Sequence, residues 1–163
     1  MTQVPPDPQL QAWSALVAVY QSVLHDVVQA LEGEAGLDSG VFSALAYLAR
    51  AETPGRLPLS ALHDLMHPRY SQPGLSRLVQ RMEAEGLVER RADPRDGRAA
   101  VLVITRAGRT RFNRADGVYA GALREHFGCH LTGAQARALA AALMPVTRGR
   151  AIRAAESRTV RTG

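Results

Sequence analysis

Apolar residues recur at three- and four-residue intervals through residues 10–31, the spacing that places them on one face of an amphipathic helix. Two glycines just beyond this stretch predict the end of the helix. The next segment, DSGVFSALAYLARA, predicts a second helix that is capped by Asp38 or Ser39. A turn in ETPGRLP and a short helix in LSALHDLMH, ended by a proline, complete the pattern of the first half.

A further helix and a β-hairpin follow. The segment SQPGLSRLVQRMEAEG predicts a helix with Ser71 as its cap and Pro73 in its first turn, where a missing N–H does no harm. Gly86 predicts the end of that helix. Residues 87–92 and 99–104 are predicted to form two strands joined by an arginine-rich turn.

Two more helices are predicted after the hairpin. The sequence TRAG begins a long helix that runs to about residue 127. Thr132 and Gln135 form a capping box for a last helix, which Pro145 is predicted to interrupt. Residues 146–163 are rich in arginine and weakly patterned, which is typical of a frayed helix or, as we expect here, a basic C-terminal tail.

The order of these elements predicts a mainly α (α+β) fold. A short helix, a turn, a second helix and a hairpin indicate a winged helix-turn-helix, which we assign to residues 38–104 as a DNA-binding region. The flanking helices, residues 9–37 and 105–145, need a burial surface that one small module cannot provide. We therefore expect these N- and C-terminal helices to form a dimerisation region with a second copy of the chain. Residues 1–8 are expected to be a flexible lead-in.

Composition indicates the size class of this fold and the compartment in which it is expected. The chain has 163 residues, 46% of them hydrophobic and 21% charged, an ordinary balance for one domain with helical extensions. No apolar run approaches the length of a membrane span, and we expect no membrane partner. The N-terminal sequence lacks a basic segment followed by an apolar one, so we expect no export signal. A single cysteine excludes an internal disulfide framework and suits a cytoplasmic protein.

Charge is distributed unevenly along the chain. Residues 1–68 contain two arginines and seven acidic residues, whereas residues 69–163 contain eighteen arginines and eight acidic residues. Every basic residue is arginine, a bias that genomic base composition alone can produce. The imbalance between the halves predicts an anionic partner for the second half, and double-stranded DNA is the leading candidate.

The helix that begins after Ser71 has the polar face that major-groove reading requires. At 100° per residue its leucine, valine and methionine residues gather on one side. Arginine can donate twice to guanine and glutamine can pair with adenine, and acidic residues appear only at the far end of the helix. The candidate DNA-contacting residues of this helix are Ser71, Gln72, Pro73, Ser76, Arg77, Gln80 and Arg81.

The hairpin turn RADPRDGRAAVLV predicts a second contact with DNA. Arg95 and Arg98 would gain most in a narrow minor groove, where the potential is strongly negative. Asp93 and Asp96 are expected to brace these guanidinium groups. Arginines beside the two elements, Arg69, Arg90 and Arg91, are expected to meet phosphates, which position a protein without reading sequence.

The segment SRLVQRMEAEGLVERRADPRDGRAAVLVITRAG, residues 76–108, resembles the MarR family of bacterial transcription regulators. The resemblance lies in the helix end LVQRMEAEGLVER, the wing sequence DPRDGR and the TRAG step. It implies a homodimer on a palindromic operator, with Arg95 at the wing tip and Arg77 as the recognition-helix arginine, braced by Asp93. The turn HPRYSQPG is longer than the tight turn common in the family, which leaves open which residues of this turn reach bases.

The same resemblance implies release of DNA by a small-molecule effector such as an aromatic acid. We expect the effector pocket between the dimer helices and the DNA-binding part. For Trp13 and Tyr20, which lie on the apolar stripe of residues 10–31, core packing is the alternative role. For Arg50 the alternative is a favourable helix-dipole interaction. The candidate pocket residues are Trp13, Tyr20, His25, Tyr47 and Arg50.

Two other groups of residues suggest different chemistry. His126, Cys129 and His130 could form a metal- or oxidation-sensing site, although a cysteine between helices is more often structural. HDLMH places two histidines at metal-binding spacing, but it lacks the glutamate of a zinc-protease helix. We find no nucleophile–base pair, phosphate-binding glycine loop or carboxylate pair and expect no enzyme, cofactor or bound metal. The main alternative is a winged-helix module that binds an acidic protein.

Overall fold

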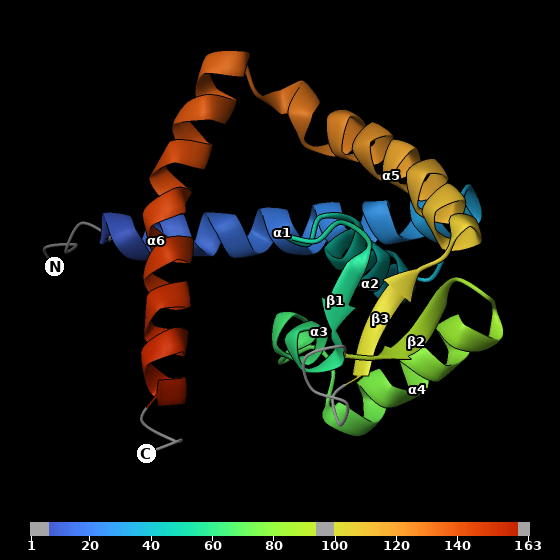
Figure 1. Ribbon diagram of the computed structural model, residues 1–163. Coiled ribbons are helices and arrows are strands. Elements are labelled where there is room, and N and C mark those ends of the chain that lie inside the picture. The colour runs from blue at the N-terminus through green and yellow to red at the C-terminus, as the bar shows by residue number, and fades with distance from the viewer. Residues whose placement is uncertain (1–6, 94–99, 160–163) are drawn as a thin grey trace, which may run out of the picture. The chain divides into compact units, whose positions relative to one another are not determined.

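The computed structural model describes residues 7–93 and 100–159, with side chains for residues 7–93 and 100–146 (Figure 1). The chain divides into two compact units, Met1–Ala122 and Leu123–Gly163. The first unit contains four helices in its N-terminal part: α1 (Pro8–Gly33), α2 (Ser39–Ala49), α3 (Leu59–Met66) and α4 (Gln72–Ala84). The strands are β1 (Arg56–Pro58), β2 (Val88–Ala92) and β3 (Ala100–Ile104).

The remaining elements are α5 (Arg106–His126), a 3-10 turn η1 (Gly128–His130) and α6 (Gly133–Thr159). This order confirms the predicted winged helix-turn-helix, with α3 and α4 as the helix pair and β2–β3 as the hairpin. Across the described residues, no helix is long and apolar enough to cross a membrane.

The sheet has one strand more than the sequence predicts. Within the described chain the strands are ordered β1-β3-β2, and both pairings are antiparallel. ETPGRLP was predicted to be only a turn, and this is wrong, because β1 pairs Leu57 with Leu102. A three-residue strand is too short to show an alternating pattern in the sequence. Gly55 begins the pairing by accepting a hydrogen bond from the Ile104 N–H at 2.8 Å.

The core of the first unit is built around α2. Seven of its eleven residues are buried, so this helix contacts its neighbours on most sides. The Phe42 ring lies 5.9 Å from the Phe112 ring and 4.9 Å from the Tyr119 ring, measured between centroids, which joins α2 to α5. Leu62, Val79 and Leu102 bring α3, α4 and the sheet to the same core. The helix pair and the hairpin therefore rest on a closely packed base.

The second unit confirms one prediction and corrects another. The Thr132 N–H donates to Gln135 Oε1 at 2.9 Å, and the Gln135 N–H donates to Thr132 Oγ1 at 3.3 Å, as a capping box requires. Pro145 was predicted to interrupt the last helix, but it lies inside α6, which continues to Thr159. The alanine- and leucine-rich residues before the proline are strong helix formers, and they favour a helix on that side of it.

Candidate nucleic-acid interface

Helix α4 has one buried face and one exposed polar face. Leu75, Leu78, Val79 and Met82 are buried, as the sequence predicts. The Ser71 hydroxyl caps the helix by accepting from the Gly74 N–H at 3.3 Å. In Figure 1 this helix lies at the lower edge of the first unit, beside α3 and the hairpin. All six candidate side chains on the helix itself are exposed: Gln72, Pro73, Ser76, Arg77, Gln80 and Arg81.

The middle of the exposed face is available for a partner. Within the part of the chain that the structure describes, the side chains of Gln72, Ser76 and Gln80 make no hydrogen bond. The Arg77 Nε donates only weakly, at 3.4 Å, to the carbonyl oxygen of Pro73 one turn earlier. These polar groups can therefore turn their full hydrogen-bonding capacity to base edges.

Two candidate arginines at the margins of this face have partners on α2. The Arg69 guanidinium donates to Ser39 Oγ at 2.8 Å. Arg81 forms an ion pair with Asp38 at 3.1 Å and lies 4.0 Å from the Glu85 carboxylate. The sequence does not predict either contact, because no local pattern links the start of α2 to Arg69 before α4 or to Arg81 within it.

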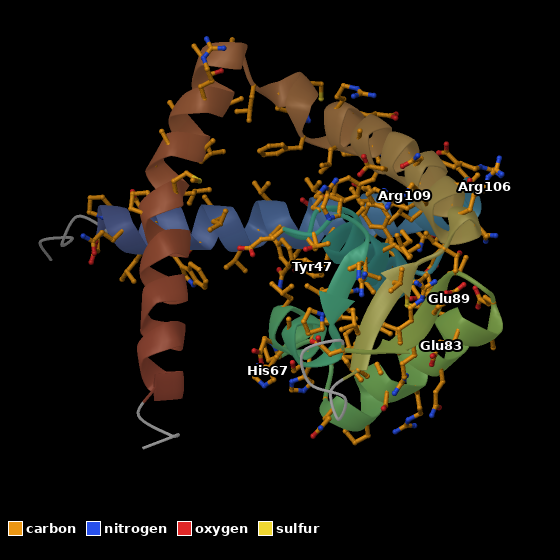
Figure 2. All side chains as sticks on the ribbon, in the orientation of Figure 1. Tyr47, His67, Glu83, Glu89, Arg106 and Arg109 are labelled. Atoms are coloured by element: carbon orange, nitrogen blue, oxygen red, sulfur yellow. The ribbon has the colours of Figure 1, made fainter. Side chains whose placement is uncertain are left out.

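The strand arginines are paired with carboxylates. Arg90 contacts Glu83 at 3.3 Å and Arg91 contacts Glu89 at 2.7 Å. Glu83 on α4 and Glu89 on β2 are labelled in Figure 2 on the same side of the fold. All four side chains are partly or largely exposed, so a phosphate can compete for either guanidinium at little cost.

The hairpin tip is only partly described. Asp93, at the end of β2, is half-buried. The other predicted wing residues, Arg95, Asp96 and Arg98, lie outside the described residues.

The base of the hairpin is tied to α5. The Thr105 hydroxyl donates to the Gly86 carbonyl oxygen at 2.7 Å and accepts from the Gly108 N–H at 2.9 Å. A Cβ on Gly108 would overlap the carbonyl oxygen of Leu87, so only glycine fits there. The TRAG step thus holds the first turn of α5 against the end of α4 and the start of β2.

An open cleft of about 960 Å³ lies within the first unit, between α1, α2, α3 and the β1 segment. Of the five predicted pocket residues, Tyr20, Tyr47 and Arg50 line it. Trp13 and His25 do not, and both are exposed on α1. The other cationic residues of the lining, Arg56 and Arg69, were not predicted for this role. The lining also includes the apolar residues Leu24, Val27, Val28, Leu31, Phe42, Ala46 and Leu65.

Arg50 is held in place at the rim of the cleft. Its guanidinium forms an ion pair with Asp116 at 2.7 Å and lies 5.6 Å from the centre of the Phe112 ring. The favourable helix-dipole role suggested by its sequence position is compatible with these contacts, because Arg50 is the C-cap of α2.

The histidine and cysteine residues do not form a metal site in the described chain, where no group of three or more His, Cys, Asp or Glu side chains could hold an ion. Cys129 is exposed, and its thiol donates to the Glu125 carbonyl oxygen at 2.8 Å. The rings of His63 and His67 lie 6.1 Å apart. Neither the predicted His126, Cys129 and His130 site nor HDLMH therefore gains support from this geometry.

Comparison with known proteins agrees with this geometry. Residues 35–99, which span α2 to the hairpin, match the model of the MarR family. The fold also matches AbsC, a MarR family transcriptional regulator from Streptomyces coelicolor, with a TM-score of 0.74 and 26% identity over 91% of this chain and 97% of AbsC. Over residues 35–99 the chain is similar to the MarR family. The family that these residues resemble, like AbsC, is one of transcription regulators.

Two further solved structures share the fold. Sco3205 from Streptomyces coelicolor, solved in complex with DNA, has a TM-score of 0.73 and 24% identity over 91% of each chain. BpsR from Bordetella bronchiseptica, whose DNA binding is regulated by 6-hydroxynicotinic acid, has a TM-score of 0.70 and 20% identity over 88% of this chain and 98% of BpsR. No curated protein matches this chain in sequence.

Proposed function

We propose that this regulator binds a palindromic operator as a homodimer, acts as a repressor in the cytoplasm and releases DNA when a small acid occupies its cleft. The observation that carries the DNA-binding part is the exposed face of α4. Its central side chains are polar and include no acid, and within the described residues their one hydrogen bond is the weak one from Arg77 to the Pro73 carbonyl oxygen. An ordinary solvated helix mixes acids with arginines along its length, whereas a groove-facing helix must exclude acids near the phosphates.

The contacts divide into two kinds. Arg77 and Gln80, with Gln72 and Ser76, are assigned to base edges in the major groove. The remaining candidates position the helix and the wing on phosphates or in the minor groove: Arg69, Ser71, Pro73, Arg81, Arg90, Arg95 and Arg98. Arg90 would then exchange its ion pair with Glu83 for one with a phosphate. Asp93 and Asp96 are assigned to bracing the arginines of the wing.

The homodimer follows from apolar surface on the flanking helices. Trp13 is 63% exposed and Tyr20 is 60% exposed, although both lie on the apolar stripe of α1. A monomer rarely leaves such a stripe in water. The second unit also has exposed apolar residues on α6, namely Leu139, Met144 and Val146. We assign residues 9–37 and 105–145 to the dimer and residues 38–104 to DNA.

The cleft fits a small organic acid. Aromatic and aliphatic side chains offer an apolar surface, and three arginines outnumber the one acid of the lining, Glu52. An aromatic carboxylate would place its ring against Tyr47 or Phe42 and its charge near Arg50 or Arg56. The regulation of BpsR by 6-hydroxynicotinic acid supports the same class of effector here.

The DNA-binding proposal is tested by a salt titration. The unmodified protein is used to enrich a duplex from a random-sequence library, and Kd is measured for that duplex and for a scrambled duplex of equal composition. We expect nanomolar binding to the enriched duplex, much weaker binding to the scrambled one, and log Kd rising with log salt concentration by about 0.9 per phosphate contacted. Equal affinity for both duplexes would instead favour the protein-binding module, with the basic surface meeting an acidic partner.

A second arm of this titration tests the cleft. A panel of aromatic carboxylic acids that includes 6-hydroxynicotinic acid is added to the complex with the enriched duplex. At least one acid is expected to raise Kd, and Arg56→Gln is expected to weaken that response without changing DNA affinity in its absence. If no acid alters Kd, the cleft does not bind this class of effector.

A further inference from the structure

Three consecutive residues at the start of α2 each contact the DNA-reading elements. Asp38 pairs with Arg81 of α4, Ser39 accepts from Arg69, and Gly40 lies against the ring of Tyr70. We call these six residues the α2 junction. Arg69 and Tyr70 belong to the segment between α3 and α4, so the junction ties both the entry to α4 and its third turn to one point of the core.

Gly40 and Tyr70 form the closest contact of the junction. A Cβ on Gly40 would overlap the Tyr70 hydroxyl oxygen and lie 2.9 Å from Cζ of the ring, closer than real Cβ atoms approach. Gly40 is not among the described glycines with positive φ, so any L-residue could adopt its backbone conformation. Without a side chain at position 40, the phenol lies directly on the first turn of α2, and a Cβ there would force the Tyr70 ring to move.

The two flanking contacts restrain the same segment. Asp38 accepts from the Gly40 and Val41 N–H groups at 2.8 and 3.0 Å. These hydrogen bonds hold its carboxylate in place for the ion pair with Arg81. The Arg69 guanidinium lies 6.0 Å from the centre of the Tyr70 ring. Each ion pair or hydrogen bond is exposed and individually weak. The Tyr70 ring, in contrast, is held against Gly40 by steric contact, which the ion pair and the hydrogen bond do not provide.

We propose that Tyr70 is a positioning residue for α4, and that Gly40 is glycine in order to accept it. The inference rests on the proposed DNA-binding function of α4. Tyr70 need not touch DNA. Its ring fixes the path of the segment HPRYSQPG and so the position of the first turn of α4. That position sets the angle at which Arg77 and Gln80 meet the bases. Ser39 and Arg69 also line the cleft, so the junction physically connects the cleft to this helix.

A double-mutant cycle tests the pair. Gly40→Ala, Tyr70→Ala and the double variant are compared in the full chain for Kd on the enriched duplex and on the scrambled duplex. Each single substitution is expected to reduce the ratio of the two affinities about tenfold, while binding to the scrambled duplex, which depends on charge, stays unchanged. The double variant is expected to lose little more than Tyr70→Ala alone, because without the ring the added methyl group meets only the Asp38 carboxylate oxygen, 3.0 Å from a Cβ at position 40.

The matched control is Gly33→Ala. Gly33 is also helical, a Cβ there meets nothing within 4 Å, and its position lies on the side of α1 opposite the Trp13 and Tyr20 stripe, so the affinity ratio should be unchanged. Thermal unfolding shows whether each variant folds; if Gly40→Ala does not, Tyr70→Ala, which inserts no atoms, decides the matter. A normal affinity ratio in folded Tyr70→Ala, or losses that add in the double variant, would overturn the proposal. Failure of the unmodified protein to discriminate the duplexes would instead reject the proposed function.

Discussion

Replacing Arg77 or Gln80 by alanine is expected to weaken binding to the enriched duplex by about 1–3 kcal/mol, roughly tenfold to a hundredfold. Both side chains are exposed on α4 and neither has a strong internal partner in the described chain. Their removal therefore costs base contacts and leaves the fold intact. The base preference at one position of each half-site should relax for each variant, which enrichment of the same library by the variant would show.

Arg90→Ala provides the contrast for this experiment. Its guanidinium lies on β2 beside Glu83 and is assigned to a phosphate. Its loss should weaken binding to enriched and scrambled duplexes by the same factor and lower the salt slope by about one phosphate-equivalent. If Arg77→Ala and Gln80→Ala behave in this uniform way too, α4 does not read bases.

Replacing Trp13 by glutamate is expected to have the largest effect, converting the dimer to a monomer. The indole is 63% exposed in the single chain, and in the proposed dimer it is covered by the second copy. A carboxylate buried there without a partner would be strongly unfavourable. Loss of the second half-site contact should then reduce operator affinity by about a hundredfold or more. Sedimentation equilibrium and the duplex titration measure the two consequences.

Gln11→Glu is the matched control, because it adds the same charge to the opposite, exposed face of α1. It should leave both the mass and the operator affinity unchanged. A Trp13→Glu protein that sediments as the unmodified chain does would show that the stripe on α1 is not a subunit interface.

The helix caps and the buried face of α4 could be predicted because their signals are local. Ser71 as a cap and the buried leucines of α4 follow from spacing within one helix. The capping box at Thr132 spans four residues. Signals of this kind need no knowledge of the rest of the fold.

The features that the sequence did not predict depend on contacts between segments far apart in the chain. Strand β1 exists because β3 offers an edge, which three residues cannot reveal. The pairing of Arg81 with Asp38 and the fit of Tyr70 on Gly40 join residues from separate helices and turns. The face of α4 was predicted correctly as a polar surface, but the division of its arginines into paired and free groups required the structure.

If two symmetric copies place α4 in successive major grooves, the DNA that the unmodified protein enriches from a random library should be an inverted repeat. Its half-sites should be centred about 10 base pairs apart, one turn of the double helix. Enrichment of a site without two-fold symmetry, or of no common sequence at all, would contradict this arrangement.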